Sequence, residues 1–193
     1  MQTFSRVYDS YGQAERVVRD LESAGVPSAD ISLVANKYVS EKYAHVDDAS
    51  AAASGAGIGA AVGGGAGLLA GVGLLAIPGL GPVVAAGWLA ATAVGAIAGT
   101  AAGGIIGALV DAGTPERDAH VYSESVRRGG TLVTVKTNHP PAAIATILDR
   151  HRPIDPAMRR SEYEKAGWST FDPKAPAYRP SETEVERMRR KYD

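Results

Sequence analysis

The first 36 residues switch between two hydrophobic periods. Thr3–Tyr8 is a β-prone run, and the Ser10-x-x-Gln13 spacing after it has the form of a helix capping box. Glycine and proline at positions 25 and 27 are stop signals, after which Ile31–Ala35 again suits a strand. The apolar residues of the intervening helix share one face: Ala14, Val17, Val18 and Leu21. This order predicts a β-α-β unit with two parallel, neighbouring strands.

Residues 114–154 carry a second set of signals, in the order helix, strand, helix. Thr114-Pro115 resembles an N-cap followed by proline at the first helical position, and Gly129-Gly130 ends that helix. Thr131–Thr137 is the clearest strand, and Pro140-Pro141 opens a helix that Arg152-Pro153 closes. Neither of these two flanking segments can bury much apolar surface on its own. We therefore expect one discontinuous α+β domain, residues 1–48 plus 111–154, with a ferredoxin-like or similar open-faced fold.

Between these flanks, Ala49–Val110 contains no Asp, Glu, Lys, Arg or His. Small residues recur there at every fourth position, a spacing that stacks them on one helix face and lets backbones approach closely, as in a glycine zipper. The first series is Gly55, Gly59, Gly63, Gly67 and Gly71, and the second is Gly87, Ala91, Gly95, Gly99, Gly103 and Gly107. The pattern predicts an α-helical hairpin over residues 49–110 with its tip at Pro78, Gly79, Gly81 and Pro82.

The helix propensity of this hairpin limits where it can exist. Ile58–Ile77 includes seven glycines, which remove roughly 6 kcal/mol of propensity relative to alanine. Since the helix is apolar all round, it must be buried on every side or lie in lipid. Its length of about 30 Å matches a hydrocarbon core, and Val83–Val110 is long enough to cross with some tilt. Trp88 would then lie at the far interface.

The glycine repeats have two uses that the sequence leaves open. They suit packing of the two helices within one hairpin, and equally packing between copies. Because the grooves extend over more turns than one helix crossing needs, they favour a homo-oligomer. Basic residues flank the segment and its tip has none, so an inserted hairpin would leave both termini in the cytoplasm, at the inner membrane. These flanking residues are Lys37, Lys42, Arg117, Arg127 and Arg128.

Composition argues against other partners. A net charge of −1 and a pI near 6.4 do not suit a nucleic-acid-binding surface. The chain has no cysteine, which excludes disulfides and thiolate metal sites. Its first residues lack the apolar run of a cleaved signal peptide, so we expect none.

No motif predicts catalysis or a cofactor. Residues 65–70 match a G-x-G-x-x-A fingerprint, but no strand precedes them and no acidic residue follows about 20 positions later. The four histidines lack metal-ligand spacing. His120 lies one turn from Glu116 and Glu124, which suggests an acidic pocket, although a solvated charged face is the commoner outcome. We therefore expect no catalytic, cofactor or metal site, and the ligand of the α+β domain, if any, stays unknown.

Residues 155–193 differ in character from the rest. Asp155-Pro156 starts a short polar helix that ends at Gly167, and the proline-spaced aromatic residues beyond it indicate an extended arm. Ser181–Glu184 has the form of another capping box before a last helix. We expect the arm to pack on another subunit or back on the domain.

Several stretches together resemble a known family. The order VYDS, AGVPSADISLVA, PGLGPVVAAG and TPERDAHVYSESVRRGGTLVTV is similar to bacterial general stress proteins, including heat-induced YflT-like and low-temperature-induced proteins. The resemblance covers residues 3–137, and PGLGPVVAAG and VRRGGTLVTV are its most specific pieces. It implies stress-associated expression and no established enzymatic activity.

Two functions fit these features. The leading hypothesis is a non-enzymatic stress-associated protein that self-associates through its glycine-zipper hairpin, inserted among the lipids of the inner membrane as a scaffold. The alternative is a soluble, cytoplasmic, self-assembling structural protein, as a shell, ring or filament, whose hairpins pack on one another. A zipper-lined pore is disfavoured, because only Thr92 and Thr100 could line a conduit in the second helix.

Overall fold

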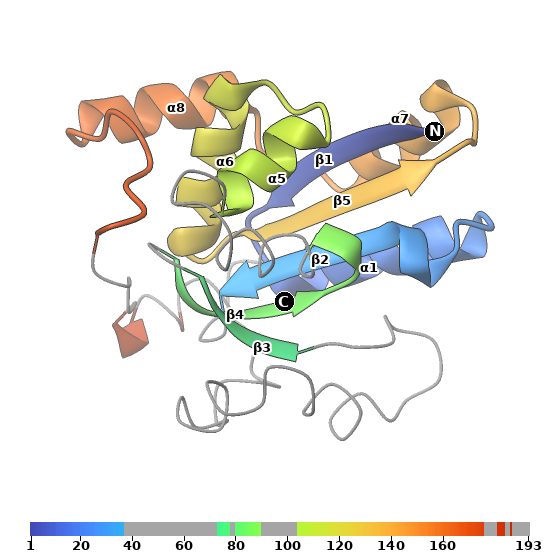
Figure 1. Cartoon of the computed structure of the whole chain (residues 1–193), viewed down its shortest axis with the longest axis horizontal. Coiled ribbons are helices and arrows are strands. Elements are labelled where there is room, and N and C mark those ends of the chain that lie inside the picture. The colour runs from blue at the N-terminus through green and yellow to red at the C-terminus, as the bar shows by residue number, and fades with distance from the viewer. Residues whose placement is uncertain (37–72, 78–79, 90–103, 176–180, 184–185, 187–193) are drawn as a thin grey trace.

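One antiparallel sheet organises the molecule (Figure 1). The computed structural model describes residues 1–36, 73–77, 80–89, 104–175, 181–183 and 186. The strands are β1 (Gln2–Tyr8), β2 (Ile31–Asn36), β3 (Gly73–Ile77), β4 (Gly81–Ala86) and β5 (Thr131–Thr137). The helices are α1 (Tyr11–Ser23), the 3₁₀ turn η1 (Ser28–Asp30), α5 (Gly104–Asp111), α6 (Glu116–Arg127), α7 (Pro141–Arg150) and α8 (Pro156–Lys165). The strand order is β1-β5-β2-β4-β3, so the predicted α+β class is confirmed.

The central position of β5 corrects the predicted β-α-β unit. β5 pairs antiparallel with β1 on one side and with β2 on the other. The strands β1 and β2 therefore run in the same direction, as predicted, but they are not neighbours. The prediction was wrong about adjacency because a crossover helix also allows a third strand to insert between the two that it connects.

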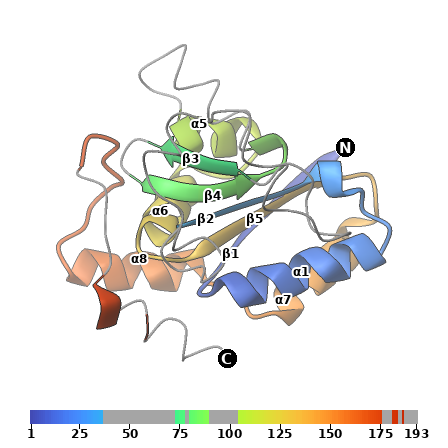
Figure 2. The same cartoon turned by 90° about the horizontal axis from the view of Figure 1, so that it is seen from below.

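Helices cover both faces of the sheet (Figure 2). On one face, α1 and α7 pack on a core that includes Val18, Val133 and Leu148. On the other, α5 and α6 pack on a core that includes Leu132 and Val126, and α8 lies against α6. Leu132 and Val133 are both fully buried although successive strand residues point to opposite faces. Both faces therefore need cover, and the open-faced, ferredoxin-like arrangement is not confirmed.

The predicted α-helical hairpin is not confirmed where the structure describes it. Gly73–Ile77 and Gly81–Ala86, expected to be helical, are β3 and β4, which pair with each other. β4 also pairs with β2 from Leu33 to Asn36. Glycine lowers helix propensity here, while the edge of β2 offers unpaired backbone groups that a strand can satisfy. Within the second predicted helix, α5 is helical, and residues 37–72 and 90–103 lie outside the described part.

The local boundary signals were good predictors elsewhere. Ser10 and Gln13 form the predicted capping box of α1, and Asp155 caps α8 with Pro156 at its first position. α6 begins at Glu116 with Pro115 at the cap, one residue later than expected, because the Thr114 hydroxyl instead bonds the Ser5 hydroxyl at 3.2 Å.

Candidate functional site

Few of the residues predicted to mediate association are described. Within the glycine series, Gly87 and Gly107 are described. Outside the described residues lie Gly55, Gly59, Gly63, Gly67, Gly71, Ala91, Gly95, Gly99, Gly103, and the tip residues Pro78 and Gly79. The other tip residues, Gly81 and Pro82, begin β4.

Gly87 has a role within the chain. Its φ is +83°, and a Cβ there would lie 2.2 Å from the Ile31 carbonyl oxygen and 2.8 Å from Ser32 Cα. Only glycine fits such a conformation and such a close approach. Gly87 thus lets the end of β4 lie against the start of β2, a requirement of this fold and separate from any contact between copies.

Gly107, in α5, is different. One side of this helix is buried through Ile105, Ala108 and Leu109, while Gly107 lies on a partly exposed side and Val110 is exposed. A Cβ at Gly107 would meet nothing within 4 Å. Packing among the described residues therefore does not require glycine at this position.

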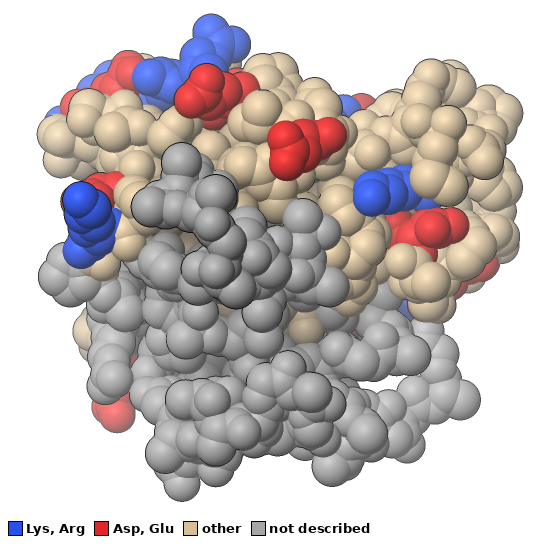
Figure 3. All heavy atoms as spheres, in the orientation of Figure 1, with Lys and Arg blue, Asp and Glu red and all other residues tan. Residues whose placement is uncertain are grey.

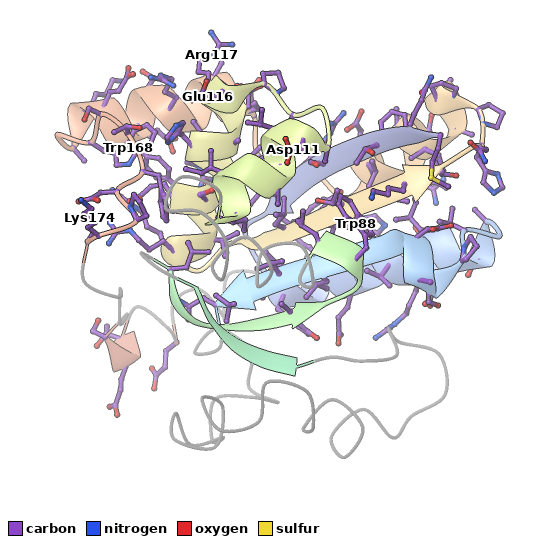
Figure 4. All side chains as sticks on the ribbon, viewed as in Figure 1. Trp88, Asp111, Glu116, Arg117, Trp168 and Lys174 are labelled. Carbon is purple, nitrogen blue, oxygen red and sulfur yellow. The ribbon has the colours of Figure 1, made fainter. Side chains whose placement is uncertain are left out.

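Trp88 lies against the sheet, whereas the sequence placed it at a membrane interface (Figure 4). It is half-buried beside the core under α5 and α6. Lys136 Nζ lies 3.4 Å from the centroid of its ring, a close cation–π contact. The segment that follows β4 is thus linked to β5 by a side-chain contact.

A buried carboxylate lies near the end of α6. Glu124 is 2% exposed in its side chain. Arg127 donates to both of its oxygens at 2.9 Å, and Arg128 Nε donates to Oε1 at 2.6 Å. The amide of Asn36 donates to the Arg127 carbonyl oxygen at 3.3 Å, which joins this cluster to the end of β2. Both oxygens of Glu124 are thus bound by arginines and not turned toward His120, so the acidic pocket suggested around His120 does not form.

Arg128 also helps to hold α8 in place, together with Arg159 of α8 itself. The Arg128 guanidinium lies 4.3 Å from the ring centroid of Tyr163, whose hydroxyl is 3.0 Å from Ser125 Oγ. Arg159 donates to Asp9 Oδ1 at 2.7 Å. Burial disfavours the charge of Arg159, but the hydrogen bond to Asp9 and the negative charge of Asp9 raise the pKa of Arg159 above its ordinary value. These contacts position helices, and they present no free reactive group.

The hydroxyls of α6 are also engaged. Ser123 and Ser125 are buried, and each donates to a carbonyl oxygen one turn earlier at 2.8 Å.

The hydroxyl of Tyr8, in β1, donates to the Leu148 carbonyl oxygen at 2.9 Å. Burial raises the pKa of Tyr8 and of Tyr122 above the ordinary tyrosine value, so both phenols stay protonated at neutral pH.

The arm folds back on its own chain as far as Phe171. Trp168, which follows α8 (Figure 4), packs edge-on against Tyr163. The two ring centroids lie 5.6 Å apart. Thr170 Oγ1 lies 2.9 Å from His120 Nδ1, and Phe171 is buried in the core under α5 and α6. This part of the arm thus contacts the domain, which is one of the two expected packing partners; packing on another subunit stays a prediction.

The surface carries charge of both signs. Acidic and basic side chains are interspersed over the described part of the face in Figure 3. Across the described ranges, no three His, Asp or Glu residues gather in a way that could hold a metal ion. None of the helices in those ranges combines the length and the apolar character needed to cross a bilayer.

The two edges of the sheet differ in sequence. The edge strand β1 contains Arg6, which pairs with Asp149 at 3.0 Å. The opposite edge strand, β3, has the sequence GLLAI and contains no charge, and its neighbour β4 contains none either. We name the side of β3 that faces away from β4 the β3 edge. The sequence pattern missed it because the glycine spacing indicated a helix there.

No family model, curated protein or solved structure matches this chain.

Proposed function

We propose that this chain is a non-enzymatic structural protein that associates with copies of itself through the uncharged segment 49–110. The observation that carries the proposal is that this segment supplies β3, an uncharged strand at the edge of the sheet. Edge strands of soluble proteins are commonly protected by charges, proline or bulges, and an unprotected edge is a template for another chain. The engaged hydroxyls of α6 and the fully paired Glu124 support a structural role over a catalytic one.

Packing between proteins is favoured over insertion in lipid. A bilayer-crossing helix over residues 58–77 needs Gly73–Ile77, and these residues instead pair with β4. The membrane scaffold is the second candidate, supported by the uncharged length of Ala49–Val110 and by the basic residues beside it. The resemblance of residues 3–137 to general stress proteins supports expression under stress in either case.

Purification with and without detergent tests both versions. The full chain is sized by light scattering after gel filtration, and bound phospholipid is measured in the same fractions. An oligomer that is free of lipid in plain buffer supports the protein-only assembly. Carbonate-resistant membrane association with co-purifying lipid selects the membrane scaffold, and a monomer in both preparations refutes self-association.

The glycine series needs its own variants. Replacing Gly63 and Gly99 together by leucine fills both predicted grooves, so the oligomer should become smaller or weaker if zippers contribute. Met158→Leu is the control, because Met158 is 68% exposed on α8 and lies outside both glycine series. Unchanged assembly of the double variant would exclude the zippers and leave the β3 edge as the contact.

A further inference from the structure

The outer edge of β1 is already occupied. The backbone N–H of Ile154 donates to the Val7 carbonyl oxygen at 2.8 Å. The Ser5 carbonyl oxygen accepts from Arg6 Nη1 at 3.0 Å and from the Tyr122 hydroxyl at 3.5 Å. A second chain therefore cannot add to β1 without displacing these donors.

The β3 edge has no such cover among the described residues. β3 ends the strand order, and β4 is its strand partner within the described ranges. A second copy brings an identical uncharged strand, so no like charges oppose each other at the contact. An antiparallel edge strand can also pair with itself about a two-fold axis, which is the commonest symmetry of homo-oligomers.

The register assigns which backbone groups point outward from β3. In antiparallel ladders, hydrogen-bonded and non-hydrogen-bonded pairs alternate. Pro82 lies opposite Ala76 and has no N–H, so this pair is of the non-hydrogen-bonded kind. Ala76, and Leu74 two residues before it, therefore direct their N–H and C=O groups away from β4.

The opposite edge of the sheet gives the same register independently. The Val7 carbonyl oxygen points outward from β1, since it accepts from Ile154. The registers of β1 with β5, β5 with β2 and β2 with β4 are uninterrupted, so the alternation of hydrogen-bonded and non-hydrogen-bonded pairs can be followed from strand to strand. Followed in this way, it directs the backbone N–H and C=O of Val83 toward β3. Val83 lies opposite Leu75, so Leu75 faces β4 and its two neighbours face outward.

We propose that two copies of this chain pair β3 against β3 in antiparallel fashion, about a two-fold axis that passes beside Leu75. Leu74 of each copy then exchanges backbone hydrogen bonds with Ala76 of the other, and Leu75 lies opposite itself in a non-hydrogen-bonded pair. The sheet continues without interruption through both copies. This inference rests on the proposed self-association and names its partner and its surface.

Disulfide trapping tests the pairing, because the natural chain has no cysteine. Opposed Cα atoms in a non-hydrogen-bonded pair lie about 4.5 Å apart, within the range that a disulfide spans. Leu75→Cys should therefore give a covalent dimer under mild oxidation. Ala76→Cys is the matched control, because its own copy would lie two residues out of register, beyond about 7 Å. Met158→Cys, 68% exposed on α8, reports random collision.

We expect Leu75→Cys to cross-link at least about tenfold faster than Met158→Cys at equal concentration, because pairing raises the effective concentration of the thiols. A mixture of Leu74→Cys and Ala76→Cys chains should give a mixed dimer, which is a second measurement if Leu75→Cys folds poorly. Rates equal to that of Met158→Cys, with the parent still oligomeric, overturn the β3 pairing but leave self-association intact. A parent protein that is monomeric would overturn both the β3 pairing and the proposed self-association.

Discussion

Neutralising the buried carboxylate of α6 is the sharpest test of how the helical layer is held. In Glu124→Gln, the amide oxygen can replace one carboxylate oxygen. The amide nitrogen then faces an arginine N–H, and because it is itself a donor it cannot accept the hydrogen bond that this N–H offers. Removing one partner of a buried ion pair typically costs about 3 to 5 kcal/mol. Arg127 and Arg128 are 20% and 34% exposed, so water compensates in part, and we expect a loss of about 2 to 3 kcal/mol.

Thermal unfolding followed by circular dichroism measures this loss. For a chain of this size it corresponds to a midpoint lowered by roughly 4 to 12 °C. Protein concentration must be matched, since association shifts the apparent stability. Glu116→Gln is the control, because Glu116 is 76% exposed and its basic partner, His120, is 4.0 Å away. This variant should change the free energy of unfolding by no more than about 0.5 kcal/mol. Equal changes in both variants would refute a structural role for the buried pair.

Three further outcomes follow from the geometry. Gly87→Ala should sharply lower the free energy of unfolding measured in urea, because its Cβ would overlap the neighbouring strand and its φ is +83°. Gly107→Ala should leave that free energy unchanged or raise it by up to about 1 kcal/mol, because alanine has the higher helix propensity. The unfolding free energy should not depend on the ionisation of Tyr8 and Tyr122 below about pH 10 and should fall above it, because both tyrosines have raised pKa values in the folded state. Tyr8→Phe should make the unfolding free energy, measured in urea titrations, fall less steeply above about pH 10. An unchanged slope would contradict a raised pKa of Tyr8. Phe171→Ala should release the arm, so that chymotrypsin cleaves after Trp168 faster than in the parent; equal cleavage after Trp168 would show that the arm is held without the Phe171 side chain.

The elements predicted best from the sequence were those with strong local signals. The capping box at Ser10 and Gln13 and the proline after Asp155 each act within one turn of chain, so the sequence contains all that is needed to place them. The strand Thr131–Thr137 was also placed correctly. Its position between β1 and β2 was not, because strand order depends on partners about 100 or more residues away, and the period of a strand does not identify its neighbours.

The glycine-rich segment misled for a physical reason. The spacing that stacks small residues on a helix face is also compatible with a strand, since Gly73–Ile77 is too short for periodicity to distinguish the two. Glu124 and its arginines were recognisable from their spacing of three and four residues on a helix. What the spacing did not reveal is burial, which arises because α8 and the end of β2 close over that turn.

The insertion of β5 between β1 and β2 has a consequence for biosynthesis. Ser5 and Thr134, whose hydroxyls lie 3.3 Å apart in the finished sheet, are separated by 129 positions in the chain. The two amino-terminal strands therefore leave the ribosome well before the strand that joins them, and the whole uncharged stretch emerges in the interval. Nascent chains of this protein pass through a long stage in which apolar surface is unshielded, and that is the stage at which chaperones have most to bind.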